Sequence, residues 1–266
     1  MKIPLFQVDA FTRNIFAGNP AAICPLEEWL DPERMQAIAA ENNLSETAFL
    51  VPNGDGYDLR WFTPKTEADL CGHATLASAF VLWNQLGSTH RTLRFNTRSG
   101  LLTVEKRDDL LVMNFPRLSP ASCENPPSAL FDGLGIQPDE VLSYMETEGS
   151  GNFLSVFASE SAVRELQPDF PLLASLGGMG VIVTAPGDTA DFASRYFAPG
   201  YGIDEDSVTG SIHCTLVPYW SERLGKQQFH AHQVSSRGGE LFCELLGDRV
   251  SIAGHAVLFM AGTIEV

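Results

Sequence analysis

Hydrophobic and polar positions along the chain follow two periods, and together they predict a mixture of strands and helices. Apolar residues alternate or form short runs where strands are expected, at 3–10, 21–24, 44–51 after a loop, 57–63, 92–115 and much of 233–266. They recur at helical spacing where helices are expected, at 32–42, 73–86 and 211–224. Asp31 and Pro32 mark the first helix start, a capping acid followed by proline at the first helical position. Pro218 is expected to kink the third helix or to delay its start.

One pattern occurs twice in the chain. Arg60-Trp61-Phe62-Thr63-Pro64 returns as Arg195-Tyr196-Phe197-Ala198-Pro199, 135 residues later. Two more blocks repeat at offsets of 138 and 139, Cys71-Gly72-His73-Ala74-Thr75 as Thr209-Gly210-Ser211-Ile212-His213 and Thr97-Arg98-Ser99-Gly100 as Ser236-Arg237-Gly238-Gly239. A repeat of this size suggests two similar domains, each with a sheet wrapped around a helix. We expect an α+β fold with halves 1–118 and 119–266, and we allow that the extreme C-terminal strand completes the first half.

Composition narrows the functional classes. The formal net charge of −16 argues against nucleic acid and anionic membranes as partners, because phosphate binding needs a basic surface. No apolar run reaches the roughly 20 residues of a spanning helix, and the first residues are too polar for a signal peptide. The five cysteines contain no CxxC pair, so neither a disulfide framework nor a structural zinc site is indicated. We therefore expect a reduced, cytoplasmic protein.

Glu46 is the first candidate for chemistry. It lies where a loop enters an apolar strand, with Leu44, Ala48 and Phe49 nearby. Apolar surroundings destabilise an ionised carboxylate and raise its pKa, which suits a general base that works near neutral pH. The alternative is a surface glutamate at a helix end, or a capping acid.

His73, Asp206 and Ser211 lie at the two repeated helix starts. A helix N-terminus disfavours the imidazolium, so a neutral His73 could pass a proton, although packing or capping is an equal alternative. Gly210 would let the backbone approach a ligand, and Ser211 could bind an oxyanion or act as an N-cap. Two such helix starts across one cleft would suit a small anion.

Two other sets of residues carry weaker signals. Cys71 precedes a helix start that would lower its pKa, but its counterpart Thr209 leaves a two-thiol mechanism without its second thiol. His230 and His232 have the spacing of two metal ligands on a strand, yet no third ligand is recognisable at a suitable distance. Nucleotide, flavin and catalytic-metal motifs are absent from the sequence, so no cofactor and no metal is expected.

These blocks in this order resemble the phenazine-biosynthesis PhzF-like isomerase family over nearly the whole chain. The residues that carry the resemblance are 8–12, 18–22, 43–49, 60–64 and 69–75 in the first half, and Glu205-Asp206, Thr209-Gly210-Ser211 and 236–240 in the second. The resemblance implies a diaminopimelate-epimerase-like fold, with two pseudo-symmetric domains, each a curled, mostly antiparallel, barrel-like sheet around a central helix. It places the active site in the cleft between them and implies a homodimer.

The resemblance also implies an activity and its residues. Characterised members isomerise a small cyclic amino acid, a dihydro-hydroxyanthranilate, without a cofactor. By this likeness, Glu46 would remove a proton from carbon and return it elsewhere, and His73 and Asp206 would assist. Ser211, with backbone at Gly72 and Gly210, would hold a substrate carboxylate, and Asn19 and Thr209 are further candidates for substrate binding.

The loop after the acidic pair departs from the family pattern. The usual Asp-Pro-Ala-Thr-Gly-Ser is replaced by Asp206-Ser207-Val208-Thr209-Gly210-Ser211, followed by Ile212 and His213 where small residues are common. This leaves the substrate open, and two other functions stay open with it. One is a two-base racemase or epimerase, and the other is an inactive ligand-binding or interaction protein on the same fold.

Overall fold

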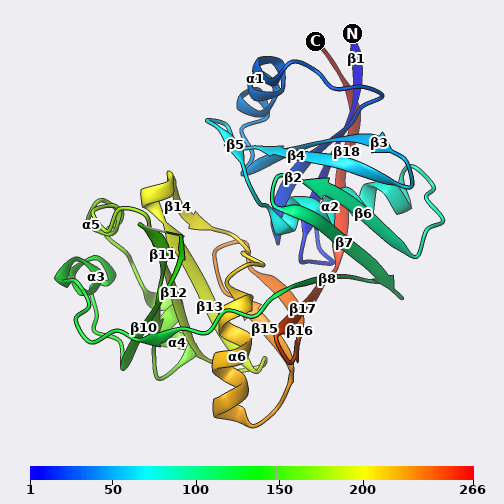
Figure 1. Cartoon of the computed structure of the whole chain (residues 1–266). Helices are drawn as coiled ribbons and strands as arrows, with labels where there is room; N and C mark the ends of the chain where they lie inside the picture. Colours follow the sequence, from blue (N-terminus) through cyan, green and yellow to red (C-terminus); the bar gives the residue numbers. More distant parts are fainter. Residues whose placement is uncertain (148) are drawn as a thin grey trace. The chain divides into compact units, whose positions relative to one another are not determined.

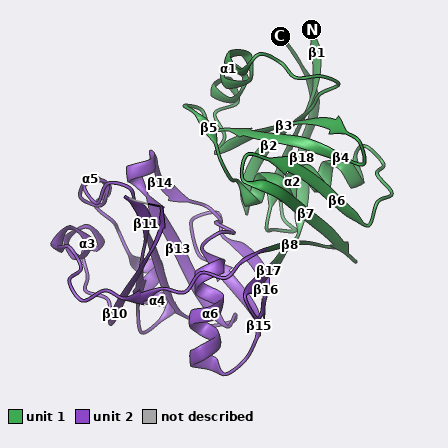
Figure 2. Cartoon of the chain, in the orientation of Figure 1, with its two compact units in different colours: residues 1–114, 252–266 green, residues 115–251 purple. Residues whose placement is uncertain are grey.

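The computed structural model describes residues 1–147 and 149–266, and the chain forms two compact units (Figure 2). Unit 1 comprises residues 1–114 and 252–266, and unit 2 comprises residues 115–251. Both combine strands with fewer helices, so the expected α+β class is confirmed.

Unit 1 is built from nine strands that begin within it and two helices. The strands are β1 (Lys2–Ala10), β2 (Asn19–Pro25), β3 (Glu46–Asn53), β4 (Gly56–Phe62), β5 (Glu67–Ala68), β6 (Thr92–Thr97), β7 (Gly100–Arg107), β8 (Leu110–Pro116) and β18 (Ala256–Glu265), and the helices are α1 (Pro32–Asn42) and α2 (Gly72–Asn84). β18 pairs antiparallel with β1 along its whole length, so the end of the chain contributes a strand to the first unit. β2 and β3 are parallel, as are β4 and β6, whereas the other registered pairs of this unit are antiparallel.

Unit 2 repeats this order of pairing. Its strands are β9 (Ala121–Ser122), β10 (Glu140–Thr147), β11 (Ser150–Val156), β12 (Met179–Pro186), β13 (Phe192–Ala198), β14 (Ile203–Asp206), β15 (Gln228–Gln233), β16 (Gly239–Leu246) and β17 (Arg249–Gly254). Its helices are α3 (Ser128–Leu134), α4 (Glu160–Glu165), α5 (Phe170–Ala174), the short 3₁₀ helix η1 (Pro199–Tyr201) and α6 (His213–Leu224). β11 and β12 are parallel and β13 and β15 are parallel, as in the equivalent pairs of unit 1.

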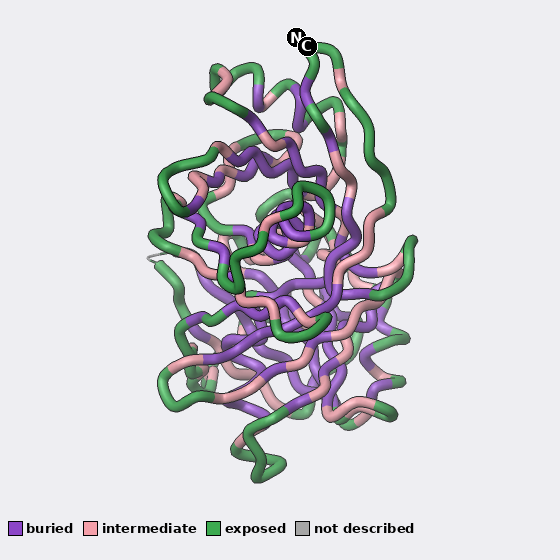
Figure 3. The backbone as a smooth tube through the Cα atoms, turned by 90° about the vertical axis from the view of Figure 1, so that its right-hand side faces the viewer, coloured by how far each residue is buried: buried purple, intermediate pink, exposed green. Residues whose placement is uncertain are grey.

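The central helix of unit 1 is α2, and the sheet curls around it (Figure 1). The sequence predicted one buried face, but α2 is buried on nearly all sides because it contacts β1, β2, β3, β7 and β18. This explains why most residues of α2 are apolar or small on every side of the helix. The sheet is curled and not closed, since no pairing between described residues joins β8 to β18. Figure 3 shows the buried backbone inside the units and the exposed backbone along the loops.

Helix α1 confirms its predicted limits. Asp31 is the N-cap residue, Pro32 is the first helical residue, and Asn43 ends the helix in the left-handed conformation with φ of 48°. Ile38 and Met35 form part of its buried stripe, as the spacing of apolar residues predicts.

Helix α6 begins at His213, two residues later than expected, and contains Pro218 in its interior. Proline has no N–H to donate to the carbonyl four residues earlier, which is that of Cys214. That carbonyl accepts a hydrogen bond of 3.0 Å from the backbone N–H of Leu118, in the segment that enters unit 2. The connecting segment thus supplies the donor that Pro218 lacks.

Candidate functional site

Unit 1 brings Glu46 and His73 together at the start of two elements. Glu46 is the first residue of β3, and His73 is the second residue of α2. Glu46 Oε2 lies 3.1 Å from His73 Nε2. Both residues are buried, at 9% and 6% exposure. The structure therefore places two sequence-predicted candidates in direct contact.

The Glu46 carboxylate has one under-satisfied oxygen. Oε2 is buried and has no hydrogen bond of proper geometry to the described residues, although His73 Nε2 is near. A buried carboxylate oxygen left in this state costs free energy, so it calls for an explanation. It leaves a lone pair of Glu46 available to an incoming donor.

Asn19 and Ser45 hold the far side of the His73 ring. Asn19 Nδ2 lies 3.2 Å from His73 Nδ1, and Ser45 Oγ donates to Asn19 Oδ1 at 3.4 Å. Asn19 is fully buried. A protonated imidazole carries an N–H on both ring nitrogens, and the one on Nε2 faces Glu46. Asn19 thus touches His73 directly.

The His73 pKa moves in the direction opposite to the sequence-based expectation. Burial alone lowers the pKa of His73, but the neighbouring Cys71 and Glu46 side chains outweigh burial and raise it well above the usual 6.5. The expectation of a neutral His73 is wrong, because a carboxylate 3.1 Å away outweighs the helix N-terminus.

Cys71 is the N-cap residue of α2 and also contacts His73. Its Sγ is 3.5 Å from His73 Nδ1. Burial and the charge of Glu46 raise the pKa of the Cys71 thiol to about 11. The expected lowering by the helix N-terminus is therefore overridden, and Cys71 is a neutral thiol at pH 7.

Unit 2 contains a second polar cluster around Asp206 and Thr209. Thr209 Oγ1 donates to Asp206 Oδ2 at 2.5 Å. Gln233 links the loop to β15, since its Oε1 accepts from Thr209 N at 2.8 Å and its Nε2 donates to the Asp206 carbonyl at 2.9 Å. Sequence analysis missed Gln233. The signal that could have revealed it is the alternation along β15, because Gln233 falls on the same buried face as Phe229 and Ala231.

The two glycines and Ser211 lie next to the helix starts, as expected. Gly72 is the first residue of α2, and a Cβ there would meet only Met113 Cε, at 3.8 Å, so a ligand has room beside this backbone. Ser211 is exposed and precedes the N-cap residue Ile212 by one position. Ser211 is therefore not the N-cap, which was the structural alternative to a binding role.

The repeat allows each position of the Glu46 cluster to be compared with unit 2. Phe62 of β4 pairs with the residue after Glu46, and its repeat equivalent Phe197 pairs with the residue after Gly180. Glu46 therefore corresponds to Gly180. A Cβ on Gly180 would lie 2.3 Å from the Tyr196 hydroxyl, so no carboxylate can occupy this position in unit 2.

The remaining members of the cluster also differ between the units. The counterparts of Cys71 and His73, at the offset of 138, are Thr209 and Ser211. The two units thus share one scaffold but do not carry matched acid and base groups.

His230 and His232 have a third partner that the sequence did not reveal. Glu240, on the neighbouring strand β16, pairs directly with His232. The ligand atoms of the three side chains lie within 4.8 Å of one another. The expectation that no third ligand exists is wrong, because strand pairing brings together residues separated in sequence.

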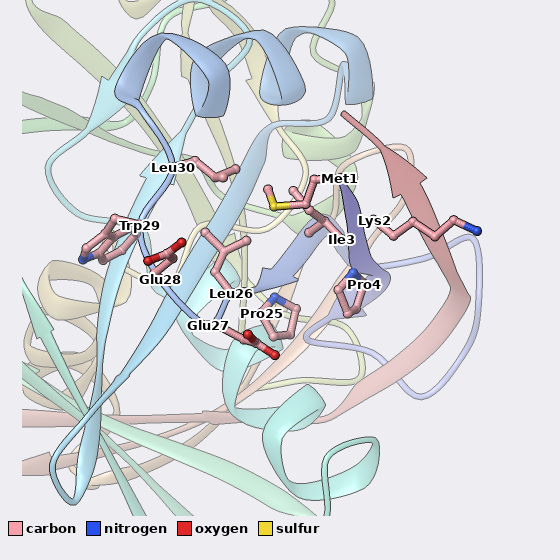
Figure 4. A pocket seen from close by; sticks show the side chains of 10 residues that line it. All are labelled: Met1, Lys2, Ile3, Pro4, Pro25, Leu26, Glu27, Glu28, Trp29 and Leu30. Carbon is pink, nitrogen blue, oxygen red and sulfur yellow. The ribbon is translucent and has the colours of Figure 1, made fainter.

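A cavity of about 440 Å³ opens elsewhere in unit 1 (Figure 4). It is lined by residues 1–4 and 25–30, and Figure 4 shows the side chains of Leu26 and Trp29 among them. None of the candidate site residues lines it. Separately, no helix within 1–147 and 149–266 is long and apolar enough to cross a membrane.

Comparison with known proteins first defines the fold class. A hydroxyproline epimerase of Agrobacterium vitis has the same fold, with a TM-score of 0.62 at 11% identity, covering 99% of this chain and 92% of that one. The chain belongs to the phenazine biosynthesis-like (PhzC-PhzF) family, whose model matches residues 8–262.

Closer relatives agree. An uncharacterized isomerase of Pseudomonas aeruginosa is 50% identical over 266 residues, covering all of both chains. The crystal structure of a PhzF family protein of Enterococcus faecalis has a TM-score of 0.94 at 45% identity and full coverage of both chains. The family and the fold suggested by the sequence blocks are therefore confirmed, and the chain is a member of an isomerase family.

Proposed function

We propose that this protein is a cofactor-independent isomerase that moves a carbon-bound proton on a small carboxylated, amino-acid-like substrate. Glu46 acts as the general base. The carbon–hydrogen bond breaks as Glu46 takes the proton, and its electron pair forms a new double bond to the adjacent carbon. The electron pair of the former double bond then takes the proton back and forms a carbon–hydrogen bond at another carbon of the same molecule. Atoms and electrons balance without a cofactor.

The observation that carries the proposal is the buried contact between Glu46 Oε2 and His73 Nε2 at 3.1 Å. The pair holds a carboxylate with an unused lone pair next to an imidazole whose pKa is raised. A base and an acid side by side are suited to remove a proton at one carbon and return it at another. Burial of both groups limits water, which would otherwise compete for the proton.

The difference between the units favours one base over two opposed bases. A racemase that uses matched groups needs an acid or base at the position equivalent to Glu46, and this is Gly180. A thiol pair is likewise missing, because Thr209 stands at the counterpart of Cys71. Within unit 1, the open backbone at Gly72 is a candidate to bind the substrate carboxylate.

The test is exchange with solvent deuterium. Wild type and Glu46→Gln are incubated in D₂O with cyclic and β,γ-unsaturated amino acids, and products are read by mass and NMR. Wild type should incorporate deuterium with migration of the double bond, and Glu46→Gln should be slower by about 10²–10⁴-fold, as loss of a general base implies. Glu41→Gln is the matched control, because Glu41 is an exposed carboxylate five residues away.

Each other outcome has a definite meaning. Full turnover by Glu46→Gln would show that Glu46 is not the base. Deuterium at a stereocentre of an otherwise unchanged substrate would establish a racemase or epimerase. Binding of an amino acid without exchange would identify a ligand-binding protein on this fold.

A further inference from the structure

A second cluster of ionisable side chains lies on the sheet of unit 2, outside the elements that carry Glu46 and His73. It consists of His230 and His232 on β15 and Glu240 on β16, which we call the β15–β16 triad. Figure 1 shows the two strands side by side. All three side chains are partly exposed, so a solute can reach them.

The geometry of the triad is convergent. Glu240 Oε1 lies 3.1 Å from His230 Nε2 and 3.7 Å from His232 Nε2. In a tetrahedral zinc site, ligands about 2.05 Å from the metal are about 3.3 Å from each other. The observed separations bracket this value, so small side-chain adjustments would suffice to enclose an ion.

The strands hold the three side chains on one face. His230 and His232 are two residues apart on β15, and Glu240 is the cross-strand partner of His232. The His230 ring stacks on Phe242 at 5.0 Å between centroids, with an interplanar angle of 8°. Packing of this kind limits the rotation of a ligand ring and reduces the entropy lost on binding.

A further carboxylate lies near the triad. Glu160 of α4 is almost fully buried, pairs with Arg164 and acts on His232 through its charge.

The fold itself does not require these residues. By the same register, the positions of unit 1 that correspond to His230, His232 and Glu240 are Arg94, Asn96 and Leu101. One unit therefore forms the same strand pair without any metal-ligating group. The triad is a feature of unit 2 alone; the hydrogen bond between His230 and Glu240 accounts for one of its contacts, but the fold does not account for the second imidazole beside the same carboxylate.

We propose that the β15–β16 triad is a binding site for one divalent transition-metal ion of the zinc class, held by two imidazoles and one carboxylate. Imidazole and carboxylate are typical zinc ligands, and three protein ligands leave a position for water. Bound metal would link β15 to β16 and stabilise unit 2, because an ion that binds only the folded state raises its stability.

The test is titration of the full chain, stripped with a chelator, with ZnCl₂ in a calorimeter. Wild type should bind one ion at this site, and His232→Ala and Glu240→Gln should each weaken that binding by at least about 10-fold. His90→Ala is the control, because His90 is an exposed histidine outside the triad. Circular dichroism of each variant establishes that it is folded.

A second group of metal ligands, Glu46 with Cys71 and His73, must be separated from the triad. Co²⁺ serves as the probe, since a site with a cysteine ligand gives a thiolate-to-metal charge-transfer band and the triad does not. Stoichiometric Co²⁺ binding without this band, lost in His232→Ala and retained in Cys71→Ser, supports the proposal. Failure of wild type to bind either ion, or binding unchanged in both triad variants, would overturn it.

Discussion

Burial and the polar neighbours of His73 have opposing effects on its protonation. Burial disfavours the imidazolium, whereas the Glu46 carboxylate at 3.1 Å favours it and raises the pKa of His73. The protonated ring presents its Nε2 N–H to Glu46, while Asn19 lies against Nδ1. The acid and the base of the proposed reaction are therefore adjacent and oriented before any substrate arrives, which lowers the reorganisation needed during the reaction.

The reactivity of Cys71 tests whether a thiolate takes part in the proposed reaction. Because burial raises its pKa to about 11, it should react with iodoacetamide at pH 7.5 at least about 100-fold more slowly than an ordinary exposed thiol. Cys123 is only partly buried and serves as the internal reference. Timed labelling followed by peptide mass spectrometry, with urea-unfolded protein as the control, measures both residues in one sample. Equal rates for Cys71 and Cys123 in the folded protein would restore a thiolate mechanism.

At the scale of elements, local signals in the sequence predicted local structure well. Asp31, Pro32 and Asn43 delimit α1 because capping depends on residues next to one another. The repeated Arg60 and Arg195 blocks revealed the repeat because the two units conserve the same strand positions.

What the sequence could not predict depends on contacts between distant residues. Glu240 reaches His232 only through strand pairing, and Gln233 reaches Thr209 only through the fold of β15. The sign of the His73 pKa change likewise required the distance to Glu46, because burial and charge act in opposite directions.

Replacing the two repeated arginines, Arg60 and Arg195, by lysine should reduce stability by different amounts in the two units. Arg195 makes a bidentate contact with Glu205 and also donates to the carbonyls of Val163 and Leu166, which fix the end of α4. Lysine cannot make this set of hydrogen bonds, so Arg195→Lys should lower the free energy of unfolding by roughly 2–4 kcal/mol.

Arg60→Lys is the matched variant in unit 1. Arg60 pairs with Glu67 in the same bidentate manner, but it is more exposed and Glu67 keeps a second partner in Arg98. We expect a loss of about 1 kcal/mol or less. Urea unfolding measures both variants, and equal losses would contradict the role given to the carbonyl contacts of Arg195.

At the scale of the whole molecule, a duplicated scaffold has diverged at equivalent points. The two units share the same order of strand pairing, yet Glu46 corresponds to Gly180 and His73 corresponds to Ser211. Unit 1 carries Glu46 and His73, and unit 2 carries the cluster of Asp206 and Thr209. Under the proposed function, this divergence favours one acid and base pair over two equal bases.

The buried histidines at the two central helices should give the molecule opposite responses to pH. His213 donates from Nδ1 to the Thr209 carbonyl, while its buried Nε2 has no hydrogen-bond partner among the described residues. Burial lowers the His213 pKa to about 4. In the unfolded chain this histidine binds a proton near pH 6.5, whereas in the folded chain it binds one only near pH 4. The free energy of unfolding should therefore fall as pH falls from 6.5 toward 4, by roughly 3 kcal/mol in total.

His73 acts with the reverse sign. Its folded pKa is raised, so its contribution to stability is complete below about pH 6.5 and is lost as pH rises through the folded pKa. Urea unfolding at pH 5, 7 and 9 should show that His213→Asn flattens the acid side of the profile and His73→Asn flattens the alkaline side. The difference in free energy of unfolding between each variant and wild type at the same pH removes the contribution of titratable groups that both proteins share. A difference that stays constant with pH for either variant would mean that the histidine has the same pKa folded and unfolded, and the opposed protonation of the two helix starts would be wrong.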